Sequence, residues 1–175
     1  MSGFLLIYSS TDGHTKKICE RIKNFLNDGS LVELVSIENV KKIDLFRFKK
    51  IIIGASIRYG KHSKELYKFI KLNKDILDQK ECAFFSVNVV ARKSEKNTAK
   101  TNPYINKFLK ISNWKPNKLR VFAGRVDYPK YNFFDKYIIK FIMFVTNGPT
   151  DTSQSFEFTD WSKVDDFSKE LKNSY

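Results

Sequence analysis

FLLIYSSTDGHT, residues 4–15, joins an apolar run directly to a polar turn that contains a glycine. The apolar residues behind this turn recur at the spacing of one helix face, and they are Ile18, Cys19, Ile22, Phe25 and Leu26. A strand, a turn and a helix in this order are typical of the first unit of an α/β fold. The remaining sequence repeats the same alternation.

Strands and helices continue to alternate after residue 26. Further strands are predicted over residues 31–37, 51–54, 82–90 and 119–126, and helices over residues 66–77, 104–109 and 161–171. The stretch before Phe48 is weakly helical, and Thr159 or Asp160 is expected to cap the last helix. Because each crossover helix returns over the sheet with the same hand, this order predicts a doubly wound parallel sheet of five strands with helices on both faces.

The composition fits one cytoplasmic domain. The chain has 175 residues, of which 42% are hydrophobic, and this is enough apolar material for one continuous core. Cys19 and Cys82 lack the spacing of a zinc or CxxC site, so buried free thiols in a reducing compartment are expected. Residues 1–8 show no basic region or cleavage site of a signal peptide. We expect a single domain over residues 1–175.

The chain is strongly basic. It contains 32 Lys and Arg residues against 19 Asp and Glu residues, which gives a formal net charge of +13. This charge predicts attraction to polyanions. Nucleic acid, anionic lipid and an acidic small molecule remain as alternatives.

The turn at residues 9–15 is the first candidate site. Its backbone N–H groups and short hydroxyls converge on the start of the first helix, where a phosphate is favoured. Ser10, Thr11 and Thr15 offer hydroxyl donors, and Gly13 permits a left-handed backbone path. An ordinary helix cap in a Ser/Thr-rich turn is the alternative. Neither the GxGxxG dinucleotide motif nor the P-loop motif occurs, which disfavours those two classes of site.

Two further turns are expected to meet the first one. In a doubly wound sheet, ligands bind beyond the carboxyl ends of the strands, where the turns after the first, third and fourth strands come together. The later two turns are GASIRYG at residues 54–60 and SVNVVARK at residues 86–93. Tyr59 could stack on a flat ring, and Asn88 could hydrogen-bond its polar edge. The alternatives are an exposed turn aromatic and a turn cap.

One segment does not fit the alternation. Residues 128–155, between the fifth strand and the last helix, are too many for an ordinary connection. Residues 133–145 are apolar apart from Asp135, Lys136 and Lys140. Because about 20 such residues would be needed to span a bilayer, this segment can only pack or lie flat. A helix packed on the sheet or on another subunit, an interfacial membrane contact and a lid over a flat substrate are the alternatives.

Several blocks of sequence resemble known flavoproteins. The turn at residues 10–15 is similar to the phosphate loop of flavodoxins, which binds the phosphate of FMN. The blocks that resemble the flavodoxin-like, quinone-dependent protoporphyrinogen oxidases of bacterial haem synthesis are IGASIRYG at 53–60, FSVNVVARK at 85–93, AGRVDYPKY at 123–131 and TDW at 159–161. This resemblance covers nearly the whole chain, includes the insertion at about 128–155, and implies a flavodoxin-like fold.

The resemblance implies FMN as the cofactor and no metal. The residues implied at the FMN are Ser9, Ser10, Thr11, Asp12, Gly13, His14 and Thr15 in the first turn, Ser56, Ile57, Arg58 and Tyr59 in the second, and Ser86, Val87, Asn88, Val89, Val90 and Ala91 in the third. Asp12 departs mildly from the phosphate-loop pattern. Because a carboxylate repels a phosphate, we expect the Asp12 side chain to point toward solvent.

The reaction implied by the resemblance is the oxidation of protoporphyrinogen IX to protoporphyrin IX, with electrons passing from FMN to a membrane quinone such as menaquinone. The propionates of the substrate would need cationic partners. The candidates are Arg58, Arg92, Lys93, Arg125 and Lys130, with solvated surface charge as the alternative for each. The sequence does not identify a catalytic residue, because the candidate proton carriers His14 and His62 have no identifiable partner.

The basic charge and the apolar segment 133–145 together predict peripheral attachment to an anionic membrane surface, at the inner face of the cell membrane. A flavodoxin electron carrier, an NAD(P)H:quinone reductase and a nucleic-acid-binding module are the competing functions. Flavodoxins are usually acidic, so the net charge of +13 disfavours the carrier. We expect no nucleic-acid partner, and a homo-oligomer is left open.

Overall fold

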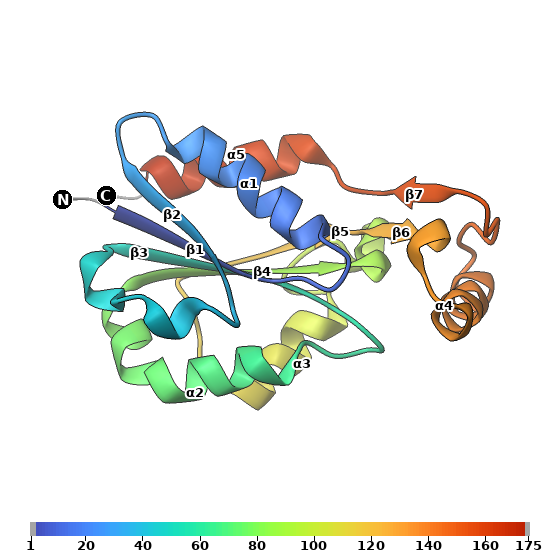
Figure 1. Ribbon diagram of the computed structural model, residues 1–175, viewed down its shortest axis with the longest axis horizontal. Coiled ribbons are helices and arrows are strands. Elements are labelled where there is room, and N and C mark those ends of the chain that lie inside the picture. Colours follow the sequence, from blue (N-terminus) through green and yellow to red (C-terminus); the bar gives the residue numbers. More distant parts are fainter. Residues whose placement is uncertain (1–2, 174–175) are drawn as a thin grey trace.

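A parallel sheet of five strands forms the centre of the molecule, in the order β2-β1-β3-β4-β5 (Figure 1). The computed structural model describes residues 3–173, so residues 1–2 and 174–175 of the expected domain lie outside it. The strands are β1 (Gly3–Ser9), β2 (Leu31–Ser36), β3 (Lys50–Ser56), β4 (Glu81–Asn88) and β5 (Lys118–Ala123). The doubly wound sheet predicted from the alternation of elements is confirmed.

Helices cover both faces of this sheet. In Figure 1, α1 (His14–Leu26) and α5 (Trp161–Asn173) lie above the sheet, and α2 (Lys64–Gln79) and α3 (Pro103–Ser112) lie below it. The Asp160 carboxylate accepts from the backbone N–H groups of Ser162 and Lys163, so Asp160 caps α5 as expected. The connection from β2 to β3 contains two short 3-10 helices, η1 (Val40–Lys42) and η2 (Leu45–Arg47). The weakly helical pattern before Phe48 corresponds to these two turns.

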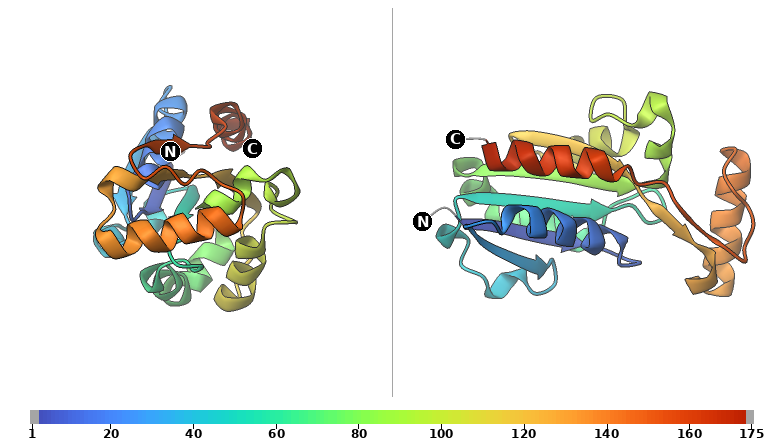
Figure 2. Two further views of the ribbon diagram at one scale, coloured as in Figure 1. Left: turned by 90° about the vertical axis from the view of Figure 1, so that its right-hand side faces the viewer. Right: turned by 90° about the horizontal axis from the view of Figure 1, so that it is seen from above.

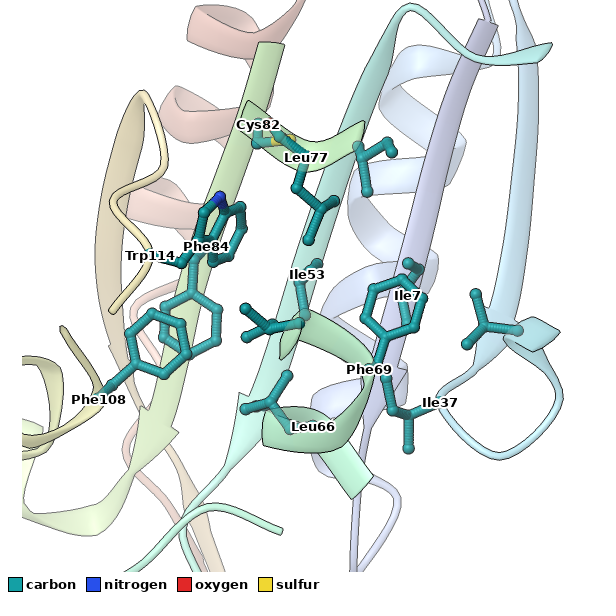
Figure 3. Packing of buried hydrophobic residues seen from close by; sticks show 14 of the residues in the cluster. Ile7, Ile37, Ile53, Leu66, Phe69, Leu77, Cys82, Phe84, Phe108 and Trp114 are labelled. Carbon is teal, nitrogen blue, oxygen red and sulfur yellow. The ribbon is translucent and has the colours of Figure 1, made fainter. Parts of the chain in front are cut away.

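Two hydrophobic cores form because neighbouring residues of a strand point to opposite faces. In β1, Leu5 and Ile7 contribute to the core on the α2 side, while Phe4 and Leu6 contribute to the core on the α1 side. Figure 3 shows the first core, in which Ile7 and Ile53 of the strands lie against the apolar residues of α2. On the same face, Phe84 of β4 stacks on Phe108 of α3. The two cysteines, one in each core, are buried and free, as expected.

The region after β5 departs from the predicted pattern. The continuous strand expected over residues 119–126 is wrong, because β5 ends at Ala123 and a separate strand β6 (Arg125–Asp127) begins after Gly124. The Gly124 N–H donates to the Asn88 carbonyl, and the Gly124 carbonyl accepts from Phe158 N–H. Gly124 is thus bonded to β4 through its N–H and to the segment after β7 through its carbonyl, and the chain leaves the main sheet at this residue. Beyond it, β6 pairs with β7 (Ser155–Glu157) in an antiparallel ribbon outside the main sheet.

The ribbon supports a helix at the end of the molecule. The turn η5 (Tyr128–Lys130) leads from β6 into α4 (Phe133–Val145), which stands beyond the carboxyl ends of the strands and opposite the two termini (Figure 2). A small third core lies between α4 and the β6–β7 ribbon, and its buried residues include Tyr128, Tyr131 and Met143, of which Met143 belongs to α4. No helix within residues 3–173 has the length and apolarity needed to cross a membrane.

Candidate functional site

The turns that follow β1, β3, β4 and β5 meet around one cavity at the carboxyl end of the sheet. This is the place where the topology of a doubly wound sheet favours a ligand. The residues that line the cavity are Ser10, Asp12, His14, Thr15, Ser56, Ile57, Val87, Asn88, Val89, Gly124 and Arg125. A larger hollow of about 680 Å³ lies between α2 and the η1–η2 connection, and none of the predicted site residues lines it.

The first turn has the geometry of an anion site. Ser10 Oγ accepts a hydrogen bond of 3.0 Å from the Gly13 N–H, which closes the turn. Gly13 has φ +84°, a left-handed conformation that disfavours any residue with a side chain, and it precedes the first residue of α1. The backbone N–H groups at the start of α1 therefore point out of the helix into this turn.

Two polar atoms beside this turn lack the partners that buried groups normally have. Among the residues that the structure describes, His14 Nδ1 and Thr15 Oγ1 are buried and make no hydrogen bond. A buried polar atom without a partner costs about 1–3 kcal/mol. Because both atoms belong to neighbouring residues at one helix N-terminus, a bound anion would satisfy them together. The residues present therefore fit a phosphate.

Asp12 has a partner that the sequence did not indicate. The residue lies at the surface, but its side chain does not simply point toward solvent, because its carboxylate lines the cavity and accepts a hydrogen bond of 3.0 Å from the Arg58 guanidinium. Partial burial raises the pKa of Asp12, and Arg58 opposes that effect. The ion pair draws the carboxylate toward the second turn and neutralises a charge that would repel an anion.

The second, third and fourth turns are tied to one another through the backbone. The Ile57 N–H donates to the Val87 carbonyl at 3.0 Å, and the Gly124 N–H donates to the Asn88 carbonyl at 3.2 Å. These bonds fix the spacing of the cavity walls before any ligand binds. A wall held in this way loses little conformational entropy on binding.

Asn88 is a turn cap. Its side-chain oxygen accepts from the Ala91 N–H at 3.0 Å, and its amide contacts Ser86 and Asn102 in a buried network. The alternative of a turn cap is therefore confirmed for Asn88. Asn88 nevertheless lines the cavity.

Tyr59 lies at the rim of the site. Its backbone has φ +49°, and its side chain is 52% exposed. The Tyr59 hydroxyl donates to the Asp135 carboxylate at the start of α4. Tyr59 thus matches the alternative of an exposed turn aromatic, but it also contacts the insertion.

Arginines from two of the turns hold the two ends of α4. Arg58, after β3, forms an ion pair with Asp135 in the first turn of the helix. Arg92, after β4, donates to the carbonyl and hydroxyl oxygens of Thr146 at 2.8 and 2.9 Å. Burial lowers the pKa of Arg92. Both guanidinium groups therefore bind residues at the ends of α4, and α4 lies across the two turns that carry these arginines.

Two of the remaining predicted cations, Arg125 and Lys130, lie at the opening, or mouth, of the site beside the first turn, whereas Lys93 lines neither cavity there. Arg125 and Lys130 approach the carboxylate of Asp127 at 3.1 and 3.3 Å. Asp127 is buried, which would raise its pKa, but hydrogen bonds from Ser155 and Lys130 lower it below the ordinary value. The carboxylate is therefore ionised and fixes both cations beside the first turn, where they line a polar cleft together with Asp12, His14 and Lys17.

His62, which the sequence did not favour as a site residue, and the predicted Ser9 both have structural partners. His62 is buried against Phe84 and Phe108 and bonds to Ser86 Oγ at 3.0 Å, and burial lowers its pKa to about 4. Ser9 bonds to Ser63 Oγ at the cap of α2. Of the residues predicted at the FMN, those that do not line the cavity are Ser9, Thr11, Gly13, Arg58, Tyr59, Ser86, Val90 and Ala91. No group of His, Cys, Asp and Glu residues within 3–173 could hold a metal ion.

Sequence reasoning missed Gly124 as a wall of the cavity. The signal was present, because a glycine directly follows the buried end of β5 in the block AGR. A Cβ at this position would lie 3.4 Å from Val87 Cγ1. The turn after the fifth strand therefore belongs to the site as much as the other three.

Comparisons with known proteins agree with this geometry. A family model described as a flavodoxin domain matches residues 5–153. The protoporphyrinogen IX dehydrogenase (quinone) of Leishmania major is 45% identical over 169 residues, which cover 95% of this chain and 73% of the relative. The enzyme of the same name from Escherichia coli (strain K12) is 36% identical over 168 residues, which cover 95% of this chain and 93% of the relative.

Solved structures show the same fold at much lower sequence identity. Oxidised flavodoxin 1 from Bacillus cereus has a TM-score of 0.58 and 15% identity, with 99% of this chain and 100% of that chain covered. This structural likeness shows the fold alone. The sequence identity to the two relatives shows, in addition, the group of enzymes to which the chain belongs. The chain therefore belongs to the flavodoxin-domain family and, within it, to the protoporphyrinogen IX dehydrogenases (quinone).

Proposed function

We propose that this chain oxidises protoporphyrinogen IX to protoporphyrin IX with bound FMN and passes the electrons to a quinone. The observation that carries the proposal is the similarity over 95% of the chain to two enzymes named for this substrate and acceptor. The cavity between the four turns supports it, because this position at the carboxyl ends of the strands is where a doubly wound sheet binds its ligand.

The first turn would hold the FMN phosphate. The N–H groups at the start of α1, the Thr15 hydroxyl and the His14 ring are the groups that face an anion there. Gly13 leaves the space above the turn open, because nothing lies within 4 Å of the position that a Cβ would occupy. The phosphate would be held by dipoles and hydroxyls, and the ion pair with Arg58 would offset the negative charge of Asp12, which lines the same cavity.

The other three turns would hold the flavin ring. Ile57 and Val87 give an apolar wall, and the backbone around Asn88 and Gly124 gives a fixed polar edge. Bound FMN supplies a ring that accepts a hydride and later releases electrons to a quinone. The residues of the four turns would hold and orient that ring.

The substrate would enter at the mouth of the site with its propionates toward the basic cleft. Arg125 and Lys130 are fixed there by Asp127, and Lys93 lies at the end of the third turn. Arg58 and Arg92 would serve the substrate indirectly, because they hold α4 in place. These assignments refine the predicted set of five cations.

The apolar side of α4 would rest on the membrane that contains the quinone. The side chains of this helix that remain exposed are Phe133, Phe134, Tyr137, Ile138, Phe141, Ile142, Phe144 and Val145. At about 1.5 Å per residue, the 13 residues of α4 extend about 20 Å, which is shorter than the hydrocarbon core of a bilayer. An interfacial position beside anionic lipid would cover this surface and keep the flavin mouth close to the quinone.

Reconstitution tests this function. Protein loaded with FMN, and the same protein freed of flavin, are mixed without oxygen with protoporphyrinogen IX and a menaquinone analogue while porphyrin fluorescence is followed. Porphyrin formation that needs both FMN and the quinone supports the proposal. If the flavin stays oxidised with this substrate but is bleached by NAD(P)H, the protein is a reductase, and the proposal is wrong.

A further inference from the structure

His14 is the first residue of α1, and its hydrogen bonds define where its protons lie. Its Nε2 is 2.6 Å from Thr159 Oγ1, which in turn is 2.7 Å from the Ala123 carbonyl oxygen. Thr159 has a single hydroxyl hydrogen, and a carbonyl can only accept. Both contacts are therefore satisfied only when Thr159 donates to Ala123 and accepts from Nε2–H of His14. Nε2 carries a hydrogen whether the ring is neutral or charged.

The other ring nitrogen is left without a partner. His14 is only 9% exposed, and its Nδ1 makes no hydrogen bond to any of residues 3–173. With Nε2 protonated, a neutral ring has a bare lone pair at Nδ1, and a charged ring has an N–H there. Burial lowers the pKa of His14, so the ring of the flavin-free protein is neutral at pH 7.

A neutral His14 does not suit the ligand that the first turn would bind. His14 lines the cavity beside Thr15, whose hydroxyl is also without a partner. A phosphate dianion has only acceptor oxygens, and these repel a lone pair but form a strong hydrogen bond with a charged N–H donor. If one proton is added to His14 Nδ1, this nitrogen and the Thr15 hydroxyl can both donate hydrogen bonds to the phosphate.

We propose that FMN binding to this chain takes up one proton from solvent, and that this proton lies at His14 Nδ1 in a hydrogen bond to the phosphate. The inference rests on the proposed function, because it assumes that FMN is the ligand. No bond is made or broken other than that to the proton, and no electrons move. His14 is a binding residue whose charge depends on its ligand.

The charges around His14 favour this change of state. Lys17 and Arg125 lower the pKa of the ring, and Glu157 raises it. Two phosphate charges would outweigh these cations and shift the pKa of His14 upward. The remaining groups that face this region are the edge of Trp161 from α5, Asp12 with its partner Arg58, Asp127 and Lys130. Among them, Asp12 is the one rival for the proton, because its pKa is raised.

Calorimetry counts the proton directly. FMN is titrated at pH 7.5 into flavin-free protein in two buffers of different ionisation enthalpy, neither of which contains phosphate. The difference in binding enthalpy gives the number of protons taken up, and we expect about one per FMN. The binding of riboflavin, which lacks the phosphate, should be accompanied by no proton uptake. FMN affinity should weaken by up to about tenfold per pH unit between the pKa of His14 in the flavin-free protein and its higher pKa in the complex, and it should level off above the latter.

Matched variants assign the proton. His14→Asn and His14→Gln should bind FMN with almost no proton uptake and a flatter pH dependence, while Asp12→Asn should keep the uptake of the parent protein. Tight FMN binding without proton uptake would overturn the inference and leave the proposed function standing. Uptake that survives in both His14 variants and disappears in Asp12→Asn would place the proton on Asp12 and also overturn it. Failure of the parent protein to bind FMN would overturn both.

If the His14 variants do not fold, as judged by circular dichroism, the parent protein still decides the question. A proton uptake near zero with FMN, or an equal uptake with FMN and riboflavin, contradicts the inference. An uptake of about one with FMN alone supports it.

Discussion

At the scale of single residues, the packing around Gly54 leaves no room for a side chain. It lies in the middle of β3, and a Cβ there would lie 2.2 Å from Phe85 Cζ. The Phe85 ring is itself packed against Phe122 and Phe167, so it has little freedom to move. The glycine therefore makes room for an aromatic ring of the neighbouring strand.

Replacing this glycine should destabilise the protein without touching the cavity. We expect Gly54→Ala to lower the free energy of unfolding by about 1–3 kcal/mol, because overpacking forces a buried ring to shift. Urea denaturation measures the change. Gly124→Ala is the control, since its Cβ would be 3.4 Å from Val87 Cγ1, which requires only a small adjustment. Equal losses in the two variants would contradict this explanation.

His62 should make stability depend on pH. Its pKa is about 4 in the folded protein and 6.5 in the unfolded chain, so the neutral ring favours folding fully above pH 6.5 and loses this advantage as pH falls toward 4. The difference corresponds to about 3 kcal/mol at pH 4. Relative to His62→Gln, the parent protein should lose about this much more free energy of unfolding between pH 7 and pH 4. Parallel pH profiles in urea would show that His62 is not buried in the neutral form.

Single residues also show where sequence reasoning ends. The pattern at Asn88 allowed either a contact to the flavin or a turn cap, and the structure shows the cap. The choice depends on Asn102, which is fourteen residues away and reaches Asn88 only when α3 packs on the sheet. The ion pair of Asp12 with Arg58 likewise joins two turns, so neither local sequence could predict it.

At the scale of elements, α4 depends on the two arginines that hold its ends. A hydrogen bond to a charged group contributes about 1.5–3 kcal/mol. We expect Arg58→Gln and Arg92→Gln each to speed amide hydrogen exchange in residues 133–145 by about tenfold or more, with the main sheet unchanged. Arg120→Gln, which removes an ion pair to α5, is the control. Unchanged exchange in α4 would mean that its small core alone holds it.

The membrane contact of α4 can be tested with matched aromatic residues. Phe141 and Phe144 on α4 and Phe46 in η2 are 68%, 72% and 70% exposed. Burial of a Phe side chain in lipid contributes about 1.5–3 kcal/mol, so Phe141→Ser or Phe144→Ser should reduce sedimentation with anionic vesicles by about tenfold or more. Phe46→Ser should change nothing. Equal effects at all three positions would contradict a specific role for α4.

Elements with a long periodic pattern could be predicted, and short ones could not. The apolar spacing in residues 14–26 and 161–173 specifies α1 and α5 directly. The three-residue strands β6 and β7 carry no such pattern, and they pair only because the chain turns away from the sheet at Gly124. The same limit applies to segment 133–145, whose hydrophobicity is compatible with several alternatives because it does not reveal what covers the segment.

At the scale of the whole molecule, the fold separates stability from function. The sheet and the four helices around it bury two cores, while the four turns and α4 lie together at the carboxyl end of the strands. Figure 2 shows this arrangement from two further sides. The order of strands could be expected from the alternation and the resemblance. The position of α4 across the mouth could not, because it depends on contacts between residues up to 77 positions apart.

The central claim is that one flavin in this mouth takes electrons from protoporphyrinogen IX and gives them to a quinone. The most direct measurement is stopped-flow spectroscopy of the two half-reactions without oxygen. We predict that protoporphyrinogen IX bleaches the bound FMN as porphyrin appears, and that a menaquinone analogue then restores the oxidised flavin spectrum. A flavin that stays oxidised with excess protoporphyrinogen IX, or a reduced flavin that the quinone does not reoxidise, would contradict the account.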